Sequence, residues 1–155
     1  MDFRITSLAP EPFAPLFGLQ AAELMRRGAR HVIADRRPGF PDRIELRDAA
    51  PGEALLLENY TYLPVDTPYR PAYAIYVLEG SRERCDRVNE VPEAFRSGVM
   101  ALRAFGRGNM LCAADIAQGT DLEGLIERLF ASAHTYYVHA HYAKPGCFAA
   151  RIERA

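Results

Sequence analysis

The sequence predicts a single α+β domain over residues 1–155, with a mixed, mainly antiparallel sheet and two to three helices. Its length of 155 residues is near the common size of one domain. Segments rich in β-branched and aromatic residues outnumber the helical segments by more than two to one. Short polar turns such as RRPGFPD and DAAPGE separate them, whereas parallel pairing needs crossovers of about a dozen residues or more. Antiparallel pairing is therefore favoured.

Three segments have helical patterns: residues 20–28, 92–100 and 119–133. The first, QAAELMRRG, has two arginines in its last turn, where cations suit the helix dipole, and it ends at a glycine. In the third, Thr120 and Glu123 have the spacing of a capping box. Apolar residues at helical spacing mark the core face of this third helix: Leu122, Leu125, Ile126, Leu129 and Phe130.

Strands are predicted where β-branched and aromatic residues concentrate. The near-continuous apolar run of residues 72–78, AYAIYVL, predicts a central strand that is covered on both faces. The predicted strands are 30–35, 43–46, 54–63, 72–78, 101–105, 110–116, 135–143 and 147–153.

Composition excludes several classes of protein. A hydrophobic content of 49% and a net charge of −1 are typical of an ordinary soluble domain, and the absence of a basic excess argues against a nucleic-acid partner. There is no leader pattern at the start and no apolar run of about 18 residues, so we expect a cytoplasmic protein with no membrane partner. The 3 cysteines form no CxxC pair and are expected to be free thiols. No feature indicates a particular cofactor or oligomeric state.

The stretch YVHAHYAKPGCFAAR, residues 137–151, concentrates the reactive side chains. Side chains two apart share a strand face, so His139 and His141 point the same way. If the two flanking strands form a hairpin with both apolar sets turned inward, His139 lies opposite Arg151 and Ala143 lies opposite Cys147. This register predicts one face that carries His139, His141, Cys147 and Arg151.

We expect this face to bind a small anion, a carboxylate or phosphate, with Arg151 and Lys144 supplying positive charge. Histidine has a reference pKa of about 6.5, so affinity should rise as the pH falls from 8 to 6. The structural alternative is that Arg151 is paired with Glu153 or Glu58.

Other functions remain open on the same residues. Cys147 could be the nucleophile of an enzyme with His139 or His141 as its base. The His-x-His pair could instead hold a metal ion with help from residues elsewhere, such as His31 or Asp35. A third class is a non-catalytic binding module that uses a face rich in tyrosine and arginine, namely Tyr60, Tyr62, Tyr69, Arg70, Tyr73 and Tyr76.

Several segments together resemble the family called domain of unknown function 1203. They are FRI near the start, GARHVIADRRPGFPDRIEL, PGEALLLENY, TPYRPAYAIYV and HAHYAKPGCFAAR, so the resemblance is nearly end to end. The family name implies no particular activity. The resemblance implies that the functional residues include Tyr69, His139, His141, Gly146 and Cys147.

Overall fold

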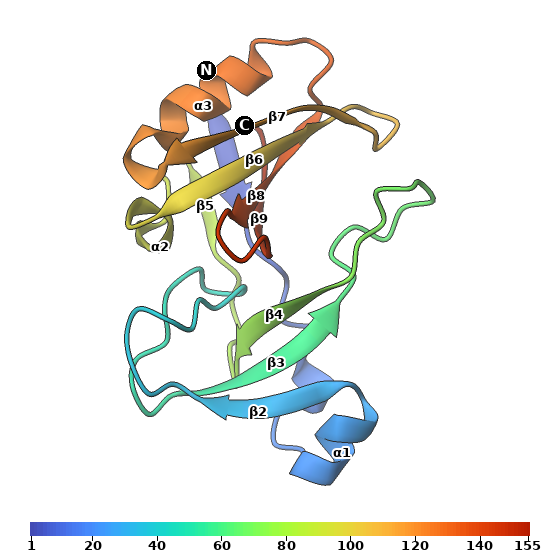
Figure 1. The fold of residues 1–155 in the computed structure, drawn as a ribbon, viewed down its shortest axis with the longest axis vertical. Helices are drawn as coiled ribbons and strands as arrows, with labels where there is room; N and C mark the ends of the chain where they lie inside the picture. The colour runs from blue at the N-terminus through green and yellow to red at the C-terminus, as the bar shows by residue number, and fades with distance from the viewer.

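The computed structural model describes residues 1–155 and confirms the α+β class, with nine strands that fall into two antiparallel sheets. A large sheet has the strand order β5-β1-β9-β8-β6-β7, and a small sheet has the order β2-β3-β4 (Figure 1). The strands of the large sheet are β5 Asp86–Val88, β1 Phe3–Thr6, β9 Phe148–Arg154, β8 Tyr137–Tyr142, β6 Val99–Phe105 and β7 Leu111–Gln118. Those of the small sheet are β2 Ala29–Ile33, β3 Ala54–Tyr60 and β4 Tyr73–Leu78.

The three predicted helices are present, as α1 Ala21–Arg26, α2 Glu93–Arg96 and α3 Leu122–Phe130. Helix α1 lies beside the small sheet and ends before Gly28, whose positive φ of 76° suits a residue without a Cβ atom. The apolar face of α3 covers the large sheet as its spacing predicts (Figure 1). The predicted capping box is wrong, because a 3-10 turn precedes α3 and Glu123 pairs with Arg96 instead.

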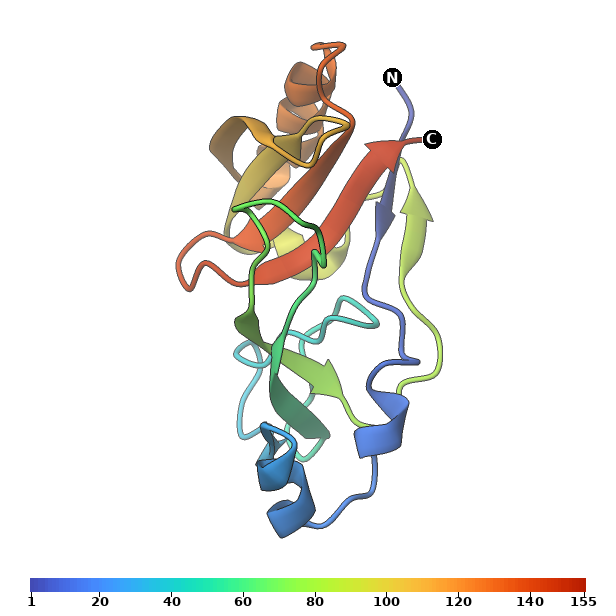
Figure 2. The ribbon, with the colours of Figure 1, turned by 90° about the vertical axis from the view of Figure 1, so that its right-hand side faces the viewer.

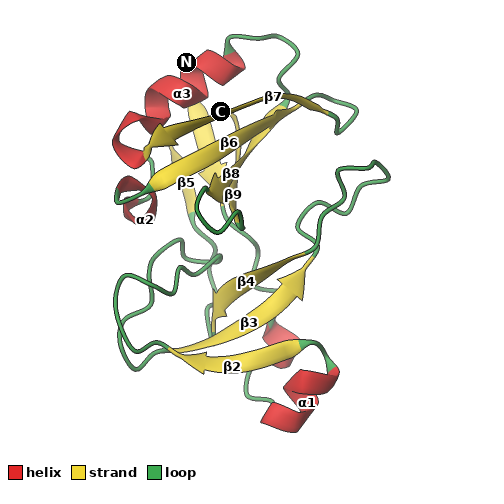
Figure 3. Ribbon diagram, viewed as in Figure 1, coloured by secondary structure: helices red, strands yellow, loops and turns green.

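Two strand predictions are wrong, and two strands, β1 and β5, were not predicted. Strand β4 is an edge strand, and β3 is the central strand of its sheet. Residues 43–46 form no strand and lie in the long loop 34–53 (Figure 3). Strands β1 and β5 have only four and three residues, too few for alternation to stand out.

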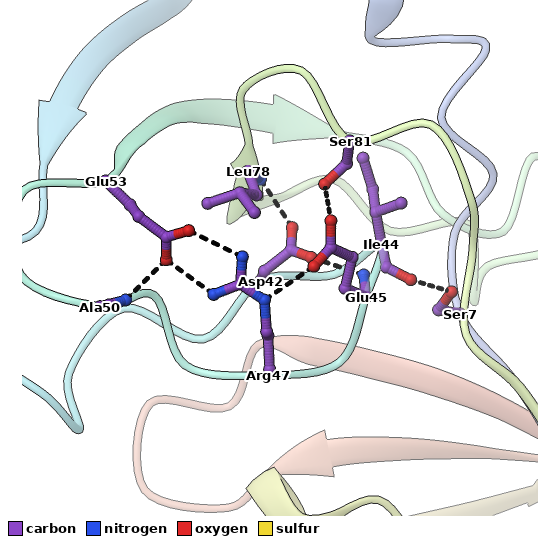
Figure 4. A network of polar contacts seen from close by, with 9 residues as sticks. All are labelled: Ser7, Asp42, Ile44, Glu45, Arg47, Ala50, Glu53, Leu78 and Ser81. Atoms are coloured by element: carbon purple, nitrogen blue, oxygen red, sulfur yellow. Dashed lines mark hydrogen bonds and ion pairs between the residues drawn. The ribbon is translucent and has the colours of Figure 1, made fainter.

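Loop 34–53 is held by a polar network in place of a strand ladder (Figure 4). The carboxylate of Asp42, which is fully buried, accepts the backbone N–H groups of Leu78 at 2.6 Å and Glu45 at 2.5 Å. Burial raises the pKa of Asp42. Arg47 makes a two-pronged ion pair with Glu53 at 2.6 and 2.8 Å. The Asp42 carboxylate thus pairs backbone N–H groups that a neighbouring strand would otherwise pair.

A second long loop, residues 61–72, joins β3 to β4 and reaches across to the large sheet. Figure 2 shows it in green in front of the β8–β9 hairpin, and the ring of Tyr62 stacks on Phe148 with centroids 4.3 Å apart. Leu63 of this loop packs with Phe105 and Tyr137 in a small buried cluster. The loop therefore covers part of the face on which the two histidines lie. Among the helices, none is long and apolar enough to cross a membrane.

Candidate functional site

The hairpin that carries the predicted site is formed by β8 and β9, and His139 lies opposite Arg151 as predicted. Between Ala140 and His141 the register shifts, because β9 contains a bulge that places His141 opposite Phe148. The predicted pairing of Ala143 with Cys147 is therefore wrong. Phe148 now stands beside the histidines, with its ring centroid 5.1 Å from that of His139.

Cys147 contacts an arginine in place of a histidine. Its sulfur lies 2.9 Å from Nη2 of Arg43, a side chain that is only 1% exposed and whose guanidinium stacks over Tyr142 at 4.9 Å. The same guanidinium donates to the carbonyl oxygens of Phe148, at 2.7 Å, and Pro41. Neither imidazole is hydrogen-bonded to the thiol. The nucleophile and base of the predicted enzyme are thus not joined.

His139 is enclosed by aromatic rings. Tyr137, Phe105 and Tyr62 have their ring centroids 5.0, 5.3 and 5.8 Å from its own, and the residue is 2% exposed. Burial, followed by the charges of His141 and two nearby arginines, lowers the pKa of His139 to about 3. Its Nδ1 is buried without a hydrogen-bond partner. His139 is therefore a neutral residue packed beneath loop 61–72.

His141 is the member of the pair that reaches a cavity. Burial, followed by the charge of Arg103, lowers the pKa of His141 to about 4. Its Nδ1 lies 3.2 Å from the carbonyl oxygen of Gly146 in the hairpin turn. Both histidines are neutral between pH 6 and 8, so the predicted rise of anion affinity through histidine protonation has no basis in this structure.

The two cations predicted for the anion site are placed elsewhere. Arg151 lies over the ring of Tyr137 at 3.8 Å and pairs with Glu153 at 2.8 Å, which is the structural alternative given above. Lys144 is exposed at the tip of the hairpin turn. Neither residue lines the cavity that His141 reaches.

That cavity has a volume of about 450 Å³ and lies between loop 61–72 and strands β6, β7 and β8. It unites His141 with two predicted ligand-binding residues from the loop, Tyr69 and Arg70. Arg103, which no sequence pattern singled out, also lines this cavity and stands opposite His139 in the β6–β8 ladder. Alternation within residues 101–105 places Arg103 and Phe105 on one face, but the pairing of β6 with β8 carries no local signal.

The charge of the cavity is positive and unbalanced. Its lining includes Arg70 and Arg103 and no aspartate or glutamate. Neither guanidinium makes an ion pair or a hydrogen bond within the chain, in contrast to Arg43, Arg47 and Arg151. Aromatic rings form much of the wall: Tyr62, Tyr69 and Phe105.

The donors required by the metal hypothesis are dispersed. No group of three or more His, Cys, Asp or Glu side chains is placed to hold a metal ion. His31 lies in the small sheet, where its ring nitrogens approach Leu19 O at 3.1 Å and a Glu79 oxygen at 3.4 Å. Asp35 pairs with Arg36 at 2.9 Å. The His-x-His pair thus gains no third ligand from either residue.

Comparison with known proteins gives one match. Residues 39–154 match the model of the family described as "Protein of unknown function (DUF1203)". The chain belongs to this family. No curated protein and no solved structure matches the chain. The segment matched to DUF1203 contains the β8–β9 hairpin, loop 61–72 and β6, so every residue that lines the cavity lies within it.

Proposed function

We propose that this member of DUF1203 binds a small anion, carrying a carboxylate or phosphate group, in the cavity beneath loop 61–72. The observation that carries the proposal is the pair of arginines, Arg70 and Arg103, that line the cavity without any anionic partner. Guanidinium groups offer a planar fork of N–H donors that matches a carboxylate or phosphate. A ligand would supply the acceptors that the chain does not.

The surroundings of Arg103 favour such a ligand over water alone. Arg103 is partly buried between the loop and the sheet, so its charge is less screened than that of a fully exposed arginine. The cavity volume of about 450 Å³ falls in the range of small-molecule sites. The rings of Tyr62, Tyr69 and Phe105 provide an apolar wall for the body of an organic anion.

The charge of the site is constant over the physiological pH range. Arginine stays protonated, and burial keeps the pKa of His141 at about 4. Neither the two arginines nor His141 therefore changes its charge between pH 6 and 8. We therefore expect the affinity for a carboxylate or sulfate, whose own charge is also constant, to be nearly flat across that range, unlike at a site that depends on histidine protonation.

Calorimetric and NMR titrations with phosphate, sulfate, acetate and benzoate test the proposal. We expect binding by at least one of them and a loss of affinity of about tenfold or more in Arg103→Gln and Arg70→Gln, because charge-assisted hydrogen bonds are lost. Arg151→Gln is the matched control, since Arg151 is already paired with Glu153. Equal affinities for wild type and the Arg70→Gln, Arg103→Gln double variant, or no binding of any anion, overturn the proposal.

A further inference from the structure

The geometry points to a ligand that carries a hydrogen-bond donor, such as a hydroxyl group, beside its anionic group. This inference rests on the proposed function and deepens it, because it names the chemical class of the anion: a hydroxycarboxylate or a hydroxylated phosphate ester. The residue that selects for the donor is His141, the one imidazole that lines the cavity.

The hairpin turn fixes the proton of the His141 ring. A carbonyl oxygen only accepts hydrogen bonds, so the contact of 3.2 Å between Nδ1 and the Gly146 oxygen requires the proton on Nδ1. A neutral imidazole carries a single N–H. The other nitrogen, Nε2, is therefore left as an acceptor with a free lone pair.

The chain does not satisfy this acceptor. The Gly146 contact is the single hydrogen bond that the His141 side chain makes within the chain, and the residue is only 1% exposed. Nε2 is not among the fully buried atoms without a partner, so its remaining solvent contact is made through the cavity that His141 lines. A hydrogen-bond donor on the ligand would take the place of water at this acceptor.

A simple carboxylate, sulfate or phosphate monoester dianion cannot supply that donor. Such an anion presents lone pairs only, which suit the N–H groups of Arg70 and Arg103 and repel the lone pair on Nε2. A hydroxyl group on the same small molecule serves Nε2 while its anionic group serves the guanidiniums. Such a molecule matches both kinds of polar group on the cavity wall.

Matched pairs of ligands test this inference on the unmodified protein. Glycolate is compared with methoxyacetate, and 3-hydroxybenzoate and 4-hydroxybenzoate with their methoxy counterparts, since methylation removes the donor and keeps the oxygen and the carboxylate. We expect the better hydroxylated member of at least one pair to bind about fivefold more tightly, the ratio typical of one net hydrogen bond. In His141→Phe the ratio of affinities within that pair should fall to about one, whereas in His139→Phe it should stay as in wild type.

Long-range ¹H–¹⁵N spectra of the imidazoles provide a readout that needs no ligand. They should show Nδ1 of His141 protonated and Nε2 unprotonated near pH 7. A proton on Nε2, or equal affinities within every pair, overturns the inference and leaves the anion site intact. If no carboxylate binds at all, the proposed function fails and this inference fails with it.

Discussion

The arginines of loop 34–53 and those of the cavity beside loop 61–72 differ in whether the chain supplies their hydrogen-bond and ion-pair partners. In loop 34–53, Arg47 is matched to Glu53 and Glu45, and Arg43 donates to two carbonyl oxygens and contacts a sulfur. At the cavity beside loop 61–72, Arg70 of the loop and Arg103 of β6 have no hydrogen-bond acceptor from the chain. Satisfied polar groups hold a fold together, whereas groups that break this rule are expected at functional sites. The difference separates the arginines whose partners the chain supplies from those that we propose bind a ligand.

Replacing Arg43 should give the largest loss of stability. Arg43→Ala leaves the carbonyl oxygens of Phe148 and Pro41 without their donor in the interior and removes the packing of the guanidinium on Tyr142. We expect the free energy of unfolding to fall by about 3 kcal/mol or more. Urea denaturation measures it, with the exposed Arg82→Ala as a control that should change stability by less than about 0.5 kcal/mol. A loss for Arg43→Ala no greater than the control contradicts the structural role.

Acid should weaken the two regions in different pH windows. The pKa values of His139 and His141 are lowered in the fold to about 3 and about 4, so the unfolded chain binds more protons below pH 6.5. Stability that is fully present above pH 6.5 is therefore lost as the pH falls toward these values. The two histidines together should cost about 2 kcal/mol between pH 6.5 and 5.5.

The Arg47–Glu53 ion pair of loop 34–53 is lost at a lower pH than the contribution of the histidines. Arg47 lowers the pKa of Glu53 to about 2, so the stability that the ion pair contributes persists above the ordinary glutamate pKa and is lost as the pH falls below about 4.5 toward 2.

Unfolding curves at pH 7, 6.5, 5.5 and 5 measure the loss of stability that protonation of the two histidines causes. In His139→Phe the decline between pH 6.5 and 5.5 should be about half as steep, and an unchanged slope would show that His139 is not the titrating group.

Breaking the partly exposed Arg47–Glu53 ion pair should lower the free energy of unfolding by less than either change above. Arg47 and Glu53 are about one third exposed, at 35% and 34%, so solvent screens their attraction. We expect Arg47→Gln to lower the free energy of unfolding by about 1 kcal/mol, since two-pronged geometry places the pair at the upper end for exposed ion pairs. A double-mutant cycle with Glu53→Gln isolates the coupling between the two side chains. A coupling of zero would mean that the backbone contacts alone order the loop.

The sequence predicted what depends on local periodicity. Helix α3 and strands β6 to β9 follow from apolar spacing, and the pairing of His139 with Arg151 follows from parity and the Pro-Gly turn. Parity failed one step later, at the bulge in β9, because one additional residue reverses every inward and outward assignment beyond it. Cys147 was therefore assigned to the wrong neighbours.

The cavity lay beyond sequence reasoning for a different reason. Its walls come from loop 61–72 and from three strands, β6, β7 and β8, that are separated from the loop in the chain and belong to the other sheet. Tyr69 and Arg70 were recognised by residue type, but the contact between this loop and the histidine face is a product of tertiary packing. The same packing removes water from the imidazoles, which is why their ordinary pKa was a poor guide.

The smallest effect on stability should come from the arginines of the cavity, and it is the sharpest test of the comparison. Arg103→Gln and Arg70→Gln remove charges that have no partner in the unliganded chain, so we expect the free energy of unfolding to stay within about 0.5 kcal/mol of wild type. A loss above about 1.5 kcal/mol would show that these guanidiniums have partners within the fold, as those of Arg43 and Arg47 do.

Arg103→Gln should also raise the pKa of His141, because the positive charge of Arg103 is one of the causes that lower it. NMR titration of the His141 ring should detect this rise, whereas Arg107→Gln, which removes an exposed arginine stacked on Tyr136, should leave the titration unchanged.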